Sequence, residues 1–152
     1  MDMQGKVALV TGGNAGIGLA TALAFAKRGA AVAITGRREP EGKAAVERLK
    51  SAGAKAIFIR ADAASEADAQ RTVAETVRAF GRLDYAFNNA GVEGAVPVPV
   101  AQQTVENFRH VFDINVLGVL LSMKHQIPAM LASGVGGGGA AAAKFNRTIR
   151  NC

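Results

Sequence analysis

The chain contains 152 residues, 49% of them hydrophobic and 20% charged, which is typical of one globular domain with its own core. The net charge is +6, and Lys144, Arg147 and Arg150 in the C-terminal tail contribute three of these charges. The remaining charges are interleaved, which argues against nucleic-acid binding. No apolar run approaches the roughly 18 residues of a membrane span, and the N-terminus lacks a signal-peptide pattern. We therefore predict a cytoplasmic protein that binds neither nucleic acid nor membrane.

Strand and helix patterns alternate along the chain. The predicted strands are short, β-branched and almost wholly apolar, as expected for strands that are covered on both faces. They cover residues 6–11, 31–35, 56–60 and 84–88, and the helices between them cover 16–29, 41–52 and 65–80. Ser65 should cap the last of these helices and Gly81 should end it. Because the connections are short, the alternation predicts an α/β fold with a doubly wound parallel sheet of Rossmann type.

A long helical region is predicted from 104 to 131, after a Gly/Pro-rich loop at 92–100. Pro128 should kink or fray this region near its end. Its apolar residues recur at helical spacing and are Val105, Phe108, Val111, Phe112, Val116, Leu120 and Met123. In the first helix, the predicted apolar face contains Ile17, Ala20, Leu23, Ala24 and Ala26.

The turn between the first strand and the first helix is rich in glycine, since Thr11–Gly18 reads TGGNAGIG. Backbone N–H groups and the helix dipole at such a turn attract phosphate, and glycines allow its close approach. A tight turn would explain one glycine, but the presence of Gly12, Gly13, Gly16 and Gly18 favours phosphate binding. A nucleoside-triphosphate loop would need Lys and Ser or Thr after its last glycine, and here Leu19 and Ala20 follow. The spacing is also not the G-x-G-x-x-G of the commonest dinucleotide fold.

The spacing TG-x3-G-x-G resembles that of the short-chain dehydrogenase/reductase family. Two further motifs carry the resemblance: residues 88–91 read NNAG, and 113–118 read DINVLG, in which Asn115 falls on the family's catalytic asparagine. Asp62 follows the third strand, where the family contacts adenine. The resemblance covers roughly residues 4–133 and implies a dinucleotide site. The cofactor-binding residues that it implies are Gly12, Asn14, Gly16, Ile17, Gly18, Arg37, Arg38, Asp62, Ala63, Asn89, Ala90 and Gly91.

The end of the second strand indicates which cofactor is preferred. NAD-dependent enzymes place Asp or Glu there to accept a hydrogen bond from the ribose 2′-hydroxyl, but this chain has Gly36. Arg37 and Arg38 follow and can bind a 2′-phosphate as charged forks. A solvated arginine pair at a loop tip is the alternative. The missing acid favours NADP over NAD.

The resemblance implies an oxidoreductase that transfers hydride between NADP(H) and a small alcohol or ketone. In the family a tyrosine moves the proton, a lysine four residues later lowers its pKa, and a serine positions the substrate oxygen. This chain has one tyrosine, Tyr85, followed four residues later by Asn89, and no serine occurs after Ser133. We therefore predict that the 152-residue chain has no turnover of its own. A non-catalytic dinucleotide-binding module, or a truncated or frameshifted fragment, is the alternative.

The chain changes character at Gly134, so we predict a Rossmann domain at 1–133 and an atypical Gly/Ala-rich segment with a basic tail, without a strand pattern, at 134–152. The fourth strand should then form an edge of the sheet. In the resembled family the helical region corresponding to 104–131 helps build the oligomer interface, which implies a homo-oligomer. His110 and His125 lie too far apart for a helical metal motif, and Cys152 is the only cysteine, so no metal site is expected.

Overall fold

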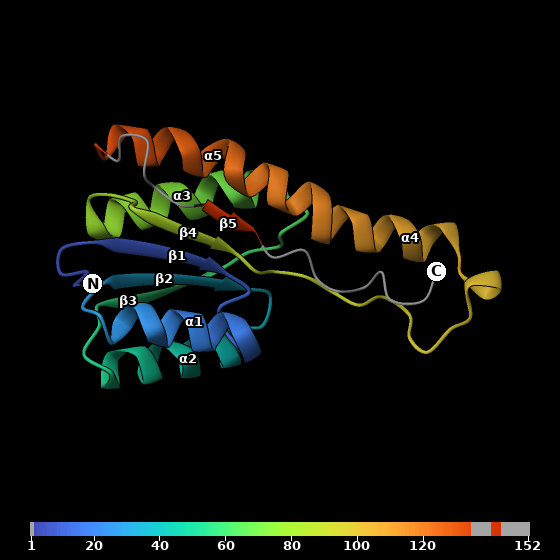
Figure 1. Ribbon diagram of the computed structural model, residues 1–152, viewed down its shortest axis with the longest axis horizontal. Coiled ribbons are helices and arrows are strands. Elements are labelled where there is room, and N and C mark those ends of the chain that lie inside the picture. The colour runs from blue at the N-terminus through green and yellow to red at the C-terminus, as the bar shows by residue number, and fades with distance from the viewer. Residues whose placement is uncertain (1, 135–140, 144–152) are drawn as a thin grey trace.

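A parallel sheet with helices on both faces forms the body of the molecule (Figure 1). The computed structural model describes residues 2–134 and 141–143, and the strand order is β3-β2-β1-β4-β5. The strands are β1 (Val7–Thr11), β2 (Ala31–Gly36), β3 (Ala56–Arg60), β4 (Tyr85–Asn88) and β5 (Ala141–Ala143). Helices α1 (Gly16–Ala26) and α2 (Glu39–Ser51) cover one face, and α3 (Glu66–Phe80) and α5 (Gly118–Ala132) cover the other. The predicted doubly wound parallel sheet is confirmed.

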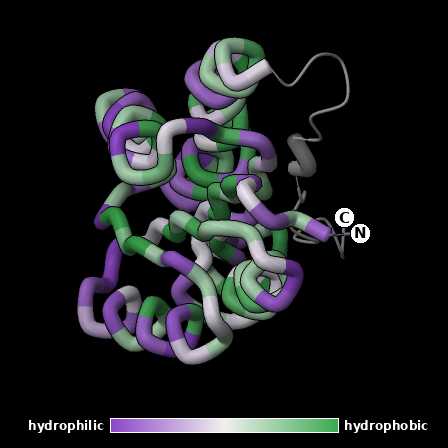
Figure 2. Tube along the Cα trace, turned by 90° about the vertical axis from the view of Figure 1, so that its left-hand side faces the viewer, coloured by the Kyte–Doolittle hydropathy of each residue, from purple (hydrophilic) through white to green (hydrophobic). Residues whose placement is uncertain are grey.

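The core consists of two apolar layers, one on each face of the sheet. Val10 and Ile34 pack with residues of α1 and α2, whereas Leu9 and Ala33 pack with residues of α3 and α5. Successive side chains of a strand point to opposite faces, so each strand contributes to both layers. Figure 2 looks nearly along the strands and shows the sheet between its two helical layers. Burial on both faces explains why the strand sequences are apolar throughout.

Helix α1 packs through a face that overlaps only in part with the predicted one. Its buried residues are Gly18, Leu19, Ala22 and Ala26, whereas Ile17 is 55% exposed. Gly18, Ala22 and Ala26 recur every four residues, so the smallest side chains bring the helix close to the sheet. The prediction was wrong for Ile17 and Ala20, which are exposed, because apolar residues surround the whole helix and periodicity could not choose among them. It was right for Ala26, which is buried, and for Leu23, which is half-buried and packs against the core, and Ala24 is half-buried.

The long helical region is continuous from Val105 to Ala132. It consists of α4 (Val105–Phe112), a π-helical turn (Asp113–Leu117) and α5, and Figure 1 shows that its α4 end projects beyond the sheet. The predicted fraying at Pro128 does not occur, since α5 continues past Pro128 to Ala132. Met130, two residues after the proline, packs in the core. No helix among the described residues is both long and apolar enough to cross a membrane.

Strand β5 corrects the predicted edge of the sheet. Ala141 pairs with Ala86 and Ala143 pairs with Asn88, in parallel with β4. The prediction that β4 is an edge, and that 134–152 contain no strand, was therefore wrong for residues 141–143. Backbone N–H and C=O groups drive this pairing whatever the side chains are, and alanine gives little strand signal in a sequence. The basic tail, with Lys144, Arg147 and Arg150, lies outside the described residues.

Asp84 joins the sheet to the end of α5 at the amino ends of the strands. Its side chain is 3% exposed and accepts hydrogen bonds from the Val7 N–H at 2.9 Å and from Arg82 Nη2 at 2.6 Å. Arg82 also donates to the backbone oxygen of Ser133, and Ser133 Oγ accepts from the Leu83 N–H at 3.0 Å. Burial alone would raise the pKa of Asp84, but the Arg82 and Val7 hydrogen bonds outweigh it and lower the pKa below the usual value.

Candidate functional site

The carboxyl ends of β1 and β4 are joined by side-chain hydrogen bonds. Thr11 Oγ1 accepts from the backbone N–H groups of Asn89 at 3.0 Å and Ala90 at 3.1 Å. Asn89 Nδ2 donates in return to the backbone oxygens of Thr11 at 3.3 Å and Gly12 at 3.2 Å. The glycine turn and the NNAG motif are therefore fixed against each other, although they are far apart in sequence.

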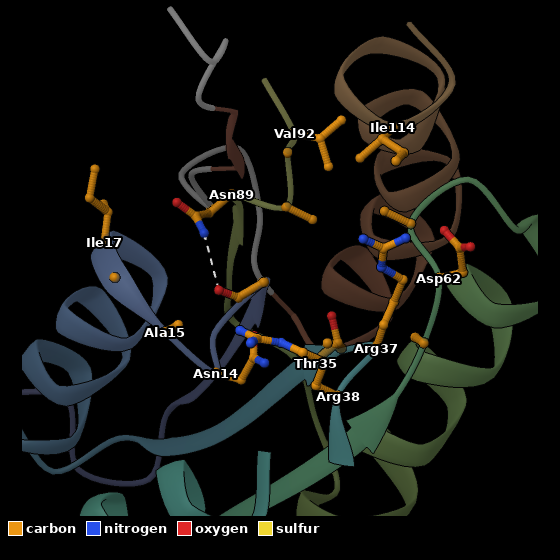
Figure 3. A pocket seen from close by; sticks show the side chains of 17 residues that line it. Asn14, Ala15, Ile17, Thr35, Arg37, Arg38, Asp62, Asn89, Val92 and Ile114 are labelled. Atoms are coloured by element: carbon orange, nitrogen blue, oxygen red, sulfur yellow. Dashed lines mark hydrogen bonds between the residues drawn. The ribbon is translucent and has the colours of Figure 1, made fainter. Parts of the chain in front are cut away.

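A pocket of about 510 Å³ opens at this edge of the sheet, and Figure 3 shows the side chains that line it. Its volume lies within the range of about 300–1,000 Å³ that is usual for small-molecule sites. The ends of β1, β2 and β4 and the loop after β3 contribute to it, so it lies where parallel sheets bind their ligands. All the predicted cofactor-binding residues except Gly18 line it, namely Gly12, Asn14, Gly16, Ile17, Arg37, Arg38, Asp62, Ala63, Asn89, Ala90 and Gly91.

Two glycines of the turn have different structural roles. Gly16 has a φ of +50°, and a Cβ atom built on it would have no neighbour within 4 Å. It therefore leaves room on the pocket side of the turn. A Cβ atom on Gly18 would lie 2.1 Å from the backbone oxygen of Gly12 and 2.6 Å from Asn89 Nδ2. Gly18 allows α1 to approach the strand ends, so it supports the site from beneath rather than lining it.

The two arginines after β2 lie on the rim of the pocket. Figure 3 shows Arg37 extending towards the side where Asp62 lies and Arg38 extending towards Asn14. Both are exposed. Asn14 occupies the space beside Gly36, because a Cβ atom on Gly36 would lie 2.7 Å from Asn14 Oδ1. Asn14, Arg37 and Arg38 therefore line the pocket beside Gly36, and position 36 itself carries no acidic side chain.

Asp62 lies in a tight turn that begins α3. Its Oδ1 atom accepts from the Ala64 N–H at 3.0 Å, and its own N–H donates to Asp68 Oδ2 at 2.8 Å. That hydrogen bond, followed by the hydrogen bond from Arg71, lowers the pKa of Asp68. Ser65 Oγ accepts from the Asp68 N–H at 3.2 Å, as the predicted cap requires. The ionised Asp68 thus fixes the loop that carries Asp62 on the pocket wall.

Asn115 lies behind the pocket wall, in the π-helical turn. It is buried, its Nδ2 atom donates to the Val92 backbone oxygen at 2.9 Å, and its Oδ1 atom accepts from the Val92 N–H at 2.9 Å. The chain after NNAG is therefore held against the long helix, and a π turn of this kind often occurs at functional sites. Five further residues line the wall and were not predicted from the sequence, namely Ala15, Thr35, Ala61, Val92 and Ile114. Each is adjacent in the chain to a predicted site residue or to Gly36, so adjacency was the available signal.

Tyr85 and the histidines lie away from the pocket. The ring centroid of Tyr85 in β4 lies 5.7 Å from that of Phe25 in α1, so the two rings pack against each other. His110 is exposed, and His125 Nε2 lies 3.4 Å from Glu66 Oε1. Within residues 2–134 and 141–143, no three His, Cys, Asp or Glu side chains gather as metal ligands would.

The sheet order, the glycine turn and the pocket at the strand ends define a Rossmann-type nucleotide-binding fold. A model of the short chain dehydrogenase family matches residues 6–138. The chain therefore belongs to the short-chain dehydrogenase/reductase family.

Two curated relatives and one solved structure illustrate the similarity. The chain is 44% identical over 136 residues to 2,5-dichloro-2,5-cyclohexadiene-1,4-diol dehydrogenase of Sphingobium indicum, covering 90% of this chain and 53% of that protein. It is 42% identical over 140 residues to A-factor type gamma-butyrolactone 1'-reductase of Streptomyces virginiae, covering 90% and 54%. A short-chain dehydrogenase/reductase from Burkholderia phymatum in complex with NAD matches with a TM-score of 0.81 and 31% identity, over 87% of this chain and 46% of that one. The chain thus spans about half the length of these relatives.

Proposed function

We propose that the chain forms the cofactor-binding half of an oxidoreductase that transfers hydride between NADP(H) and an alcohol or carbonyl substrate. The observation that carries this proposal is the strand-end pocket, which is lined by the glycine turn at Gly16, by Asn89 and by Arg37. Family membership supports the reaction class, because the relatives are named as dehydrogenases and reductases.

The residues present fit a dinucleotide. Gly16 begins α1, so the N-terminal N–H groups and the dipole of this helix can bind the pyrophosphate where no Cβ atom stands in the way. Asp62 and Ala63 lie on the wall where the adenine would bind, and Asn89, Ala90 and Gly91 line the path towards the ribose. When bound, the nicotinamide group would supply or accept the hydride, and Asn89, Ala90 and Gly91 would hold the ribose side of the cofactor.

NADP is the proposed preference. Arg37 and Arg38 provide charged donors beside Gly36, and no carboxylate stands at Gly36 to repel a 2′-phosphate. The family also includes the Burkholderia phymatum structure in complex with NAD, so membership does not decide between the two cofactors. The proposed preference for NADP over NAD depends on Arg37, Arg38 and the absence of an acid at Gly36.

Asn115 is proposed to act by positioning. Because both atoms of its amide bind Val92, it fixes the wall of the pocket beside Ile114. Tyr85 is in β4 and packs on Phe25, so it does not serve as the proton donor. We infer that the 152-residue chain binds cofactor without turnover, which keeps a non-catalytic dinucleotide-binding module as the second candidate.

A homo-oligomer is also proposed, through the outer face of the long helix. Along it, Val105, Phe108, Phe112, Val116 and Leu120 are all at least 40% exposed and follow one stripe. Phe108 and Phe112 stack with ring centroids 4.4 Å apart. Contiguous apolar surface of this kind marks an interaction site, and a second copy would offer the same stripe in return. A cytoplasmic setting remains a prediction.

The proposed function is tested by titrating the chain with NADPH and NADH and by measuring turnover with a panel of alcohols and ketones. We expect saturable binding, tighter for NADPH, and no turnover. Binding of neither cofactor to the folded chain would contradict the proposed function. Turnover with any substrate would contradict the inference that the 152-residue chain binds cofactor without turnover.

A further inference from the structure

Arg38 is already engaged by a carboxylate. Its Nη1 atom lies 2.7 Å from Glu41 Oε1, three residues further along the chain and in the first turn of α2. Among the described residues, no carboxylate oxygen lies within 4.0 Å of the Arg37 guanidinium. The two rim arginines therefore differ: the charge of Arg37 is available to a ligand, and that of Arg38 is balanced by Glu41.

We propose that Glu41 is a specificity-determining residue that weakens the preference for NADP by competing with the 2′-phosphate for Arg38. This inference rests on the proposed function and assigns to it a residue outside the pocket wall. A phosphate that approaches Arg38 must displace the Glu41 carboxylate or share the guanidinium with it. The carboxylate also repels the incoming anion, whereas a cofactor with a neutral 2′-hydroxyl meets neither effect.

Glu41 should weaken NADPH binding by competing for Arg38 more than it strengthens that binding by orienting the Arg38 side chain. The side chains of Arg38 and Glu41 are 63% and 40% exposed, so water already solvates the pair and the geometry that it imposes is weak. Removal of the negative charge acts over the whole rim, because the field of one carboxylate extends about a Debye length, roughly 8 Å at physiological salt. Glu41→Gln should therefore increase the NADPH/NADH affinity ratio about two- to fivefold, since exposed ion pairs have this order of strength.

The chain offers a matched control. Glu47 on the same helix pairs with Lys50 at 2.9 Å, also at three-residue spacing. Neither Glu47 nor Lys50 lines the strand-end pocket. Glu47→Gln removes the same charge from α2 and should leave the ratio unchanged. Circular dichroism of each variant verifies that the total helix content of the protein is unchanged.

The experiment measures dissociation constants for NADPH and NADH with wild type, Glu41→Gln, Arg38→Ala and the double variant. We expect Glu41→Gln to raise the ratio, to leave NADH binding unchanged, and to have a smaller effect in the Arg38→Ala background, where only the through-space repulsion by the carboxylate is removed. An unchanged or lower ratio in Glu41→Gln, with wild type still binding NADPH, would overturn this inference alone. A full effect in the Arg38→Ala background would overturn the route through Arg38. Failure of wild type to bind either cofactor would overturn the proposed function and this inference with it.

Discussion

The strand-end pocket and the long helix differ in how fully their side chains are bonded or covered by other residues of the chain. At the pocket, Thr11 and Asn89 bind each other's backbone, and the two atoms of the Asn115 amide bind Val92. Along the outer face of the helix, Phe108 is 57% exposed and Leu120 is 62% exposed, without cover from the described residues. Short motifs within the chain therefore determine the pocket, whereas the described residues leave the outer face of the helix uncovered.

The largest expected effect comes from filling the space beneath the pocket. Gly18→Val should lower the free energy of unfolding by about 3 kcal/mol, because its Cβ atom would press on the Gly12 backbone oxygen at 2.1 Å. Gly16→Val should cost about 1–2 kcal/mol through its positive φ and should abolish cofactor binding while the sheet stays folded. Chemical denaturation and fluorescence titration measure the two effects.

Gly53→Val is the matched control for Gly16→Val. Gly53 has a φ of +89° and open space around its Cβ direction, and it lies outside the pocket. It should show the backbone strain and keep cofactor binding. Retained affinity in folded Gly16→Val would contradict the assignment of the turn to phosphate.

The second prediction concerns the contact between the sheet and the end of α5, at the amino ends of the strands. Asp84→Asn should lower the free energy of unfolding at pH 7 by about 2 kcal/mol, because the buried Val7 N–H and Arg82 lose an ionised acceptor. The folded-state pKa of Asp84 is lowered, so its stabilisation is fully present above the unfolded pKa of about 4 and is lost as the pH falls through the lower folded value.

Urea denaturation at pH 7 and at pH 3 measures this linkage. The difference in stability between wild type and Asp84→Asn should shrink at the lower pH. A constant difference would mean that the titration of Asp84 does not contribute to stability.

The third prediction compares the contributions of Arg37 and Arg38 to NADPH binding. Arg37→Ala should weaken NADPH binding by about 1–3 kcal/mol and leave NADH binding nearly unchanged. Arg38→Ala should have the smaller effect, because Glu41 already balances its charge. Calorimetric titration with both cofactors measures the changes, and an unchanged affinity ratio in both variants would contradict the preference for NADP.

The smallest expected effect on stability is at the outer face of the helix. Leu120→Lys should change the free energy of unfolding by less than about 0.5 kcal/mol, since the side chain is already exposed, and should weaken self-association. Val100→Lys, at a site 68% exposed and off the long helix, is the control. Sedimentation velocity distinguishes the variants. Equal association of wild type and Leu120→Lys would exclude this stripe as the interface.

The sequence predicted much of the fold because buried strands and glycine turns leave local signals. The described strands β1 to β4 lie where the apolar runs predicted them, within a residue or two. Strand β5 was missed because a run of alanines gives no strand pattern, and only the unpaired backbone of β4 explains its position. The buried face of α1 was missed because the sequence does not reveal that Gly18 must lie against Gly12.

The position of the candidate site was predicted from the sequence, but several of its side-chain contacts were not. The glycine turn and NNAG indicated the pocket directly, because both lie at strand ends that a parallel sheet brings together. The ion pair between Arg38 and Glu41 was not foreseen, because the sequence shows their spacing but not the orientation of their side chains. The contacts of Asn115 likewise depend on how the π-helical turn packs against residue 92, which periodicity does not report.

One measurement tests the central claim most directly: amide chemical-shift mapping by NMR during titration of the chain with NADPH. We expect saturable shifts concentrated at Gly12, Gly16, Arg37 and Asn89, with the outer face of the helix around Leu120 unaffected. Shifts centred on the long helix, or no shifts at NADPH concentrations that saturate related enzymes, would contradict the assignment of the strand-end pocket to the cofactor.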